Sequence, residues 1–324
     1  MEILIDPAEQ PSHYETYRES YAGLPVADAP WPEDDEGPRP EAGAAAWRLS
    51  GHEWDDDGAA NIAEALDWFF EHVDAERARA LVVGQWEDCY EVDSSAIVAR
   101  LAREAGRLPA LRAIFLGAIS PEESEISWIQ QCDVTPLLEA LPGLERFEVR
   151  GGSGLELRPF RHGALRMLRA EAGGLGGGFV RAVAGSDLPA LELLELWFGV
   201  PDYGGDAGVG DLAGIMSGER LPALRHLRLQ NGGFQDDVAA ALAVAPVVAR
   251  LETLSLSMGS LGDEGAEALL SGQPLTHLRR LDLRHHYMSR EMMRRVREAL
   301  PGVEVVLSEP EDRERSWRFV EVSE

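Results

Sequence analysis

The chain has 324 residues, of which 45% are hydrophobic and 27% are charged, and its formal net charge is −27. This composition is typical of a folded protein rather than a disordered or membrane-embedded one, and the charge would repel phosphate backbones and anionic lipid surfaces. We therefore expect neither nucleic acid nor a membrane as a partner. All thirty basic residues are arginine, so chemistry that needs a lysine, such as a Schiff base or a P-loop, is excluded.

The beginning of the sequence, MEILIDPAEQ, is acidic and precedes no apolar run. It predicts a cytoplasmic protein without a secretory signal. Cys89 and Cys132 are the only cysteines, which predicts two reduced thiols and neither a disulfide framework nor a cysteine metal site. We expect no cofactor.

Residues 1–44 are acidic and proline-rich, which predicts an extended or partly disordered segment. The strings AAWRLSG and NIAEALDWFFEHV then predict a capping strand and helix at the start of a repeat domain over 45–308. The last stretch, 309–324, predicts a tail or cap that lays Trp317, Phe319 and Val320 over the last repeat.

One pattern, Leu-x-x-Leu-x-Leu, recurs along the domain at spacings of about 21 to 33 residues. Such spacing is typical of one strand plus one return segment in each leucine-rich repeat. Degenerate copies lie near Ala78 and Val303, and the clear copies begin at Leu111, Leu144, Leu165, Leu191, Leu224, Leu251 and Leu278.

Between the copies, strings such as SSAIVARLAREAG, DDVAAALAVA, DEGAEALLSG and SREMMRRVREAL have helical periodicity. Asp237, Asp263 and Ser289 are the expected caps, and Thr135 is followed by Pro136 in an expected first turn. Strands linked by helices run parallel, with right-handed crossovers. The sequence therefore predicts an α/β fold: a right-handed leucine-rich-repeat solenoid, or horseshoe. About eight or nine parallel strands would line its concave face, with helices on the convex face.

At this point the chain resembles a known group. The strings ISWIQQCDVTPLLEA, DLPALELLELWFGV, SGERLPALRHL, PVVARLETLSLS and DEGAEALLSGQPLTHLRRLDL are similar to a family of bacterial cytoplasmic leucine-rich-repeat proteins with ribonuclease-inhibitor-like repeats. The resemblance covers about residues 45–308. It implies the solenoid fold, and it implies that the chain acts as a partner of biosynthetic enzymes encoded nearby. The family has no assigned activity, so the resemblance implies no catalytic residue.

The x positions of the repeats should form the exposed concave surface, with equivalent positions of adjacent strands side by side. Glu148, Arg169, Glu195 and Arg228 alternate in charge and should pair laterally, either as a self-satisfied ladder or as a polar recognition strip. Trp197 is either an interface hot spot or covered by a neighbouring loop. The candidate binding residues of this face are Arg146, Glu148, Arg150, Met167, Arg169, Leu193, Glu195, Trp197, His226 and Arg228.

The first strands carry small residues on this face, namely Gly84, Ala113 and Gly117. Something should pack closely on them, and the N-terminal segment is one candidate.

The loops 86–93, 120–133 and 200–208 leave the strand ends and should lie along one rim. Loops of this kind carry binding residues more often than scaffold positions do. The alternative is that their carboxylates are merely solvated and that Trp128 packs under its own loop. The candidates here are Trp86, Trp128, Asp202, Tyr203 and Asp206.

These features predict a non-catalytic scaffold that binds a protein or peptide on the concave face and the rim. Two alternatives stay open: an acidic inhibitor of a basic enzyme, and a cryptic enzyme that depends on a metal or on rim carboxylates. The adjacent His285 and His286 point to opposite faces of a strand, so at most one could join a metal site. No catalytic or metal-binding residue is assigned.

Overall fold

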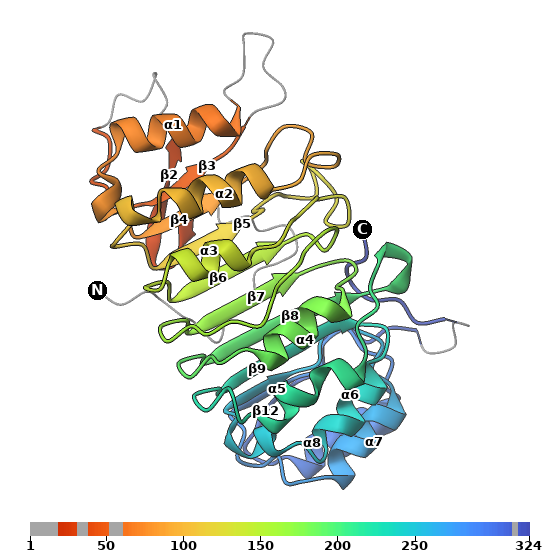
Figure 1. Cartoon of the computed structure of the whole chain (residues 1–324). Coiled ribbons are helices and arrows are strands. Elements are labelled where there is room, and N and C mark those ends of the chain that lie inside the picture. Colours follow the sequence, from red (N-terminus) through yellow and green to blue (C-terminus); the bar gives the residue numbers. More distant parts are fainter. Residues whose placement is uncertain (1–18, 31–37, 52–60, 313–316) are drawn as a thin grey trace.

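The computed structural model describes residues 19–30, 38–51, 61–312 and 317–324 (Figure 1). Within these residues the strands form one twelve-stranded sheet in strict chain order, from β1 to β12. β1 and β2 pair antiparallel, and every later neighbour is parallel. The strands are β1 Ser20–Tyr21, β2 Leu24–Ala29, β3 Ala46–Leu49, β4 Ala80–Val83, β5 Ala113–Leu116, β6 Arg146–Arg150, β7 Met167–Glu171, β8 Leu193–Gly199, β9 His226–Gly232, β10 Thr253–Ser255, β11 Arg280–Asp282 and β12 Glu304–Val306.

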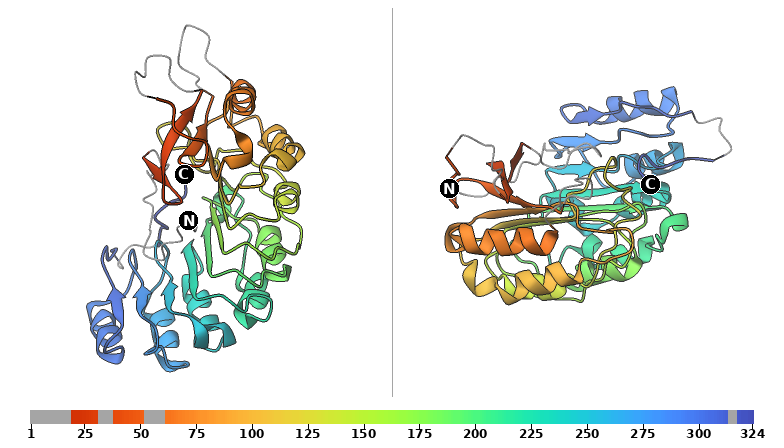
Figure 2. Two further views of the ribbon diagram at one scale, coloured as in Figure 1. Left: turned by 90° about the vertical axis from the view of Figure 1, so that its left-hand side faces the viewer. Right: turned by 90° about the horizontal axis from the view of Figure 1, so that it is seen from above.

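Helices follow most of the strands. They are α1 Ile62–His72, α2 Ser95–Arg103, α3 Thr135–Ala140, α4 Gly177–Gly185, α5 Ala213–Ser217, α6 Gln235–Leu242, α7 Asp263–Ser271 and α8 Arg290–Ala299. Short 3-10 turns lie at Ala75–Arg77, Ala105–Arg107, Pro201–Tyr203, Val209–Leu212 and Pro246–Arg250. Figure 2 shows the sheet curving, with the helices along its outer side. No helix among the described residues is both long and apolar enough to cross a membrane.

The leucine repeat sets the register of the parallel strands. The middle leucine position of each copy lies beside its equivalent on the next strand, from Leu81 and Ile114 at one end to Leu254 and Leu281 at the other. These side chains are fully buried and pack with the helices in one continuous core. Because side chains alternate along a strand, the x positions face the other way. We call this face the inner face. The predicted alternation of strand and helix and the predicted parallel pairing are confirmed.

The helix caps differ in part from the prediction. Ser289 caps α8 as expected, and its hydroxyl accepts a hydrogen bond from the Met292 N–H. Asp263 is instead the first residue of α7, and Asp237 lies inside the first turn of α6. These two carboxylates still lie at the positive end of a helix, where they oppose its dipole. Pro136 lies in the first turn of α3 as expected, and Thr135 is the first residue of that helix.

The N-terminal segment packs beside one of the three small residues, Ala113, whereas Gly84 faces Ser50 and Gly117 faces Arg150 and Gln131. Tyr21, Ala22 and Leu24 pack on Ala80 and Phe115 in a small apolar cluster of their own. The ring of Tyr21 lies 6.3 Å from that of Phe115, centroid to centroid. The stretch 1–44 therefore contributes two strands to the sheet.

The expectation for the end of the chain is only partly met. Val320 is buried, but the side chains of Trp317 and Phe319 are 65% and 50% exposed. Segment 317–324 does not stop on the last repeat. It continues along the inner side of the sheet as far as β8, where Val322 is buried against Trp197 (Figure 2).

Candidate binding surface

The predicted charge ladder is present on the inner face. Register places Glu148 beside Arg169, Arg169 beside Glu195 and Glu195 beside Arg228. Nη1 of Arg169 is 2.5 Å from Oε2 of Glu148, and its Nε is 3.1 Å from Oε2 of Glu195. Nη1 of Arg228 is 2.7 Å from the same Glu195 oxygen. Arg146 joins at one end, with its Nε 2.5 Å from Oε1 of Glu148.

The ladder is not a solvent-facing surface, which corrects the sequence-based expectation. Tyr21 covers Arg146, whose guanidinium lies 4.8 Å from the centre of the ring. Val322 covers Trp197. His226 is half-buried, and the other inner-face candidates are at most 2% exposed: Arg146, Glu148, Arg150, Met167, Arg169, Leu193, Glu195, Trp197 and Arg228.

Burial makes the ladder a structural network. Loss of water opposes ionisation of Glu195, yet the charges of Arg169 and Arg228 and a hydrogen bond from Trp197 lower its pKa to about 2. For Glu171, which Arg150 contacts at 2.7 Å, loss of water outweighs the nearby arginines and raises the pKa. Charges buried with their partners are costly to separate. Removal of one of these side chains would therefore leave a buried charge without its partner.

Trp197 is not an exposed hot spot. Its indole is 1% exposed and lies among Ile126, Met258 and Val322. The indole N–H lies 2.9 Å from Oε1 of Glu195 and 3.2 Å from Oε1 of Gln230. The alternative of a covered tryptophan is therefore correct.

The rim loops contain side chains that do face solvent. Loops 86–93 and 120–133 are joined where the Gln130 N–H donates to the Cys89 carbonyl at 2.8 Å. Trp128 on the second loop is 55% exposed, so it does not pack under its own loop. Tyr90 and Val92 on the first loop are 45% and 50% exposed. Sequence reasoning missed these two because it selected Trp86 instead.

Trp86 is the candidate that the structure removes from the rim surface. It is 1% exposed, and its indole N–H donates to the Val92 carbonyl at 2.8 Å. It supports the loop from beneath, and so presents Tyr90 and Val92 outward.

The third rim loop, 200–208, makes contacts with α4 and with the end of segment 317–324. Oδ1 of Asp206 accepts a hydrogen bond from the Gly177 N–H at 2.6 Å, at the start of α4. Asp202 is exposed. A hydrogen bond with Glu324 raises the pKa of Tyr203. Ser127 on loop 120–133 donates to the Ser323 carbonyl at 2.6 Å. Loops 120–133 and 200–208 thus meet at residues 323–324.

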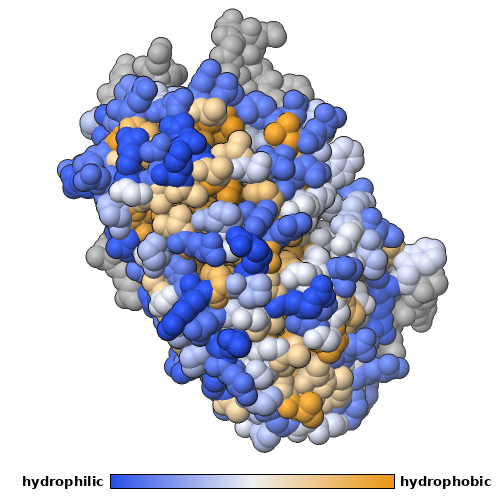
Figure 3. Space-filling view, viewed as in Figure 1, coloured by the Kyte–Doolittle hydropathy of each residue, from blue (hydrophilic) through white to orange (hydrophobic). Residues whose placement is uncertain are grey.

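The exposed aromatic side chains lie in strongly acidic surroundings. Loops 86–93 and 120–133 each contain four carboxylates and no basic residue, eight carboxylates in all. Several of these carboxylates have partners within the protein: Glu87 accepts a hydrogen bond from the Ile62 N–H at 2.7 Å, and Asp133 pairs with Arg158 at 3.2 Å. Figure 3, in which the helices face the viewer, shows hydrophilic side chains interspersed with small apolar patches. Loops 86–93 and 120–133, which we call the acidic rim, thus combine exposed apolar side chains with carboxylates and contain no basic residue.

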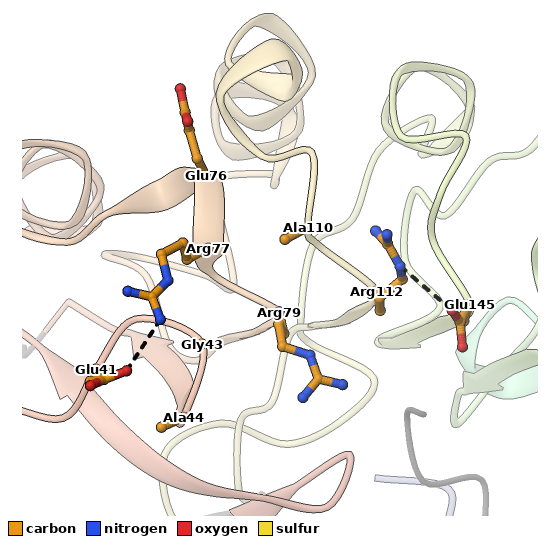
Figure 4. Close-up of a pocket in the computed structure, with 9 residues that line it drawn as sticks. All are labelled: Glu41, Gly43, Ala44, Glu76, Arg77, Arg79, Ala110, Arg112 and Glu145. Atoms are coloured by element: carbon orange, nitrogen blue, oxygen red, sulfur yellow. Dashed lines mark hydrogen bonds and ion pairs between the residues drawn. The ribbon is translucent and has the colours of Figure 1, made fainter. Parts of the chain in front are cut away.

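A pocket of about 520 Å³ lies at the amino ends of β3 to β5, at the edge of the sheet opposite the rim (Figure 4). Arg77 lies 3.2 Å from Glu41, and Arg112 lies 3.5 Å from Glu145. The lining consists of Glu, Gly, Ala and Arg, and two of its arginines pair with its glutamates. Within the described parts of the chain, no group of three or more His, Cys, Asp or Glu could hold a metal ion.

A parallel sheet with one strand per repeat, a leucine core and an aromatic acidic rim fits a leucine-rich-repeat-like solenoid. No protein-family model matches the sequence. No curated protein matches it either. Among solved structures, a protein from Bacteroides fragilis is similar with a TM-score of 0.74 and 29% identity, over 81% of this chain and 73% of that one. An internalin from Listeria monocytogenes aligns over 79% of this chain and 84% of its own, with 13% identity and a TM-score of 0.28.

Proposed function

We propose that this chain is a protein-binding scaffold whose partner surface is the acidic rim, defined as loops 86–93 and 120–133. Its partner is a basic protein or peptide that carries apolar side chains among its positive charges. Solenoids present extended rigid surfaces of this kind. Because Tyr21 and Val322 fill parts of the inner face, the rim takes over the binding role that the sequence placed on the concave sheet.

The observation that carries the proposal is Trp128, which is 55% exposed among eight carboxylates. Large aromatic residues supply much of the binding energy at interfaces, and complementary charge steers the partner into place. Tyr90 and Val92 extend the apolar area on the adjacent loop. An inhibitor of a basic enzyme would use the same charges but would not need the tryptophan.

The test is a selection of displayed random peptides on the full chain. We expect the enriched peptides to combine arginine or lysine with aromatic or aliphatic residues. Trp128→Ala should weaken their binding by roughly tenfold or more, as for an interface hot spot. Binding should also fall as salt rises.

Val244→Ala is the matched control, because Val244 is 79% exposed but lies after α6, away from the rim. It should leave peptide binding unchanged. Enriched peptides no more basic than the input library would overturn the proposal, as would equal binding by Trp128→Ala. Salt-sensitive binding that ignores Trp128→Ala would support the inhibitor instead.

A further inference from the structure

Segment 317–324 is held on the protein as an extended peptide would be. Buried Val320 and Val322 alternate with exposed Phe319 and Glu321, the period-two pattern of an extended chain. The hydroxyl of Tyr287 accepts from the Phe319 N–H at 2.7 Å and lies 3.1 Å from its carbonyl. The Glu321 N–H donates to the Met258 carbonyl at 2.8 Å.

Asn231 is the centre of this attachment. Its side-chain amide donates to the Val322 carbonyl at 2.5 Å and accepts from the Val322 N–H at 3.0 Å. Asn231 is fully buried and has a φ of +56°, in the left-handed region that asparagine tolerates better than most residues. These two hydrogen bonds hold the backbone N–H and C=O of a single residue and so do not depend on its side chain.

The side chain of Val322 enters a pocket formed by Ile126, Trp197 and Met258, where it is 2% exposed. Beyond it, a Cβ on Gly173 would lie 2.3 Å from the Ser323 carbonyl oxygen, so glycine is needed for the segment to approach. The Ser127 hydroxyl donates to the same carbonyl. Residues from five separate repeats, those of β5, β7, β8, β9 and β10, therefore converge on Glu321, Val322 and Ser323.

We propose that these residues form a peptide-recognition groove, and that segment 317–324 is its built-in ligand. The groove consists of Ile126, Ser127, Gly173, Trp197, Asn231 and Met258. In trans it accepts an extended peptide with a β-branched apolar residue at the Val322 position, flanked by acidic residues like Glu321 and Glu324. Such a peptide binds by displacing the segment. The inference does not rest on the acidic rim, because the chemistry of this ligand is taken from segment 317–324 itself.

A free peptide has to compete with segment 317–324, which is part of the same chain. A ligand on the same chain competes at an effective concentration of the order of millimolar. A free peptide with the same contacts should therefore bind the wild-type chain only weakly, and should bind well once the segment is weakened.

The experiment uses full-length chains and a fluorescent peptide with the sequence of residues 317–324, followed by anisotropy. Val322→Asp places a charge in the apolar pocket and should release the segment while leaving the groove intact. We expect this variant to bind the peptide at least tenfold more tightly than wild type. Adding Asn231→Ala should abolish the gain, and a peptide with aspartate at the valine position should not bind.

Gly173→Ala is a second route, because its Cβ would clash with the Ser323 carbonyl and with the Ser127 hydroxyl that binds this carbonyl, while no atom of the Val322 pocket or of Asn231 is among its nearest neighbours. It should loosen the end of the segment in cis. On the unaltered chain, hydrogen exchange of the Glu321 and Val322 amides should be faster than that of Leu194 and Leu227 in the neighbouring strands. Exchange as slow as in those strands would overturn the proposal, because the segment would then open only when the repeats unfold.

A folded Val322→Asp chain that fails to bind the peptide would also overturn it. Trp128→Ala should leave peptide binding in the groove unchanged, which separates a failure here from a failure of the acidic rim. Light scattering then identifies the source of the trans ligand. A concentration-dependent dimer that Val322→Asp abolishes assigns it to a second copy, and a monomer assigns it to a different protein.

Discussion

Replacement of Glu195 tests whether the inner-face ladder stabilises the fold. Glu195→Gln keeps the size of the side chain but removes the charge that Arg169 and Arg228 share. Lowering the pKa of Glu195 from 4.5 to about 2 corresponds to ~3 kcal/mol in favour of the ionised form in the folded state. Because Glu195 is only 2% exposed, solvent screening does little to reduce this value. Breaking a buried ion pair by removing one partner costs about 3–5 kcal/mol, so the two arguments agree.

We therefore expect Glu195→Gln to lower the free energy of unfolding by ~3 kcal/mol at pH 7, measured by urea denaturation followed by circular dichroism. Glu252→Gln is the control, since Glu252 pairs with Arg279 at 3.1 Å on the surface and that arginine side chain is 78% exposed. Surface pairs contribute about 0–1 kcal/mol. A loss at Glu195 no larger than that at Glu252 would refute the view of the ladder as a structural network.

Three further predictions concern pH, backbone and capping. The folded-state pKa of Glu195 lies below its unfolded value, so its contribution is complete above about pH 4.5 and is lost as pH falls toward 2. Between these values the stability of wild type should fall more steeply than that of Glu195→Gln, and parallel titrations would contradict this. Gly117 has a φ of +79° and its Cβ would lie 2.6 Å from the Arg150 carbonyl oxygen, so Gly117→Ala should cost about 1–3 kcal/mol in the same denaturation assay. Gly163→Ala, with open space around it, should change little. Asn61 forms a capping box with Glu64 at α1, so Asn61→Ala should cost about 1 kcal/mol in thermal denaturation, and an unchanged midpoint would count against the cap.

The sequence predicts the register of the strands well because every repeat has apolar residues at the same spacing. Leucines at fixed spacing bury themselves against the helices, and the pairing of Glu148, Arg169, Glu195 and Arg228 then follows from register alone. Burial of that ladder does not follow, because part of its cover comes from residues far away along the chain. Tyr21 lies 125 positions before Arg146, and Val322 lies 125 positions after Trp197. Only the small residues of the first strands indicated a cover.

In the candidate site, too, the sequence predicts where the residues lie but not which of them are exposed. Trp86 and Trp128 lie in similar acidic loops, and their sequence surroundings do not separate the buried ring from the exposed one. The Trp86 ring packs in the main core and its indole N–H donates to the Val92 carbonyl, whereas Trp128 is 55% exposed. Asn231 escaped notice because it lies just beyond the leucine pattern. The Asn-Gly-Gly run at 231–233 was the available signal for a special backbone position.

The cover of Trp197 also has a consequence for biosynthesis. Val322 follows Trp197 by 125 positions. At a synthesis rate of roughly 5–20 residues per second, the indole therefore waits about 6 to 25 s for its cover. During that interval the nascent chain presents an aromatic ring and a backbone-binding asparagine to whatever surrounds the ribosome. A chaperone that recognises extended apolar chain would have its best opportunity then, and segment 317–324 would end it.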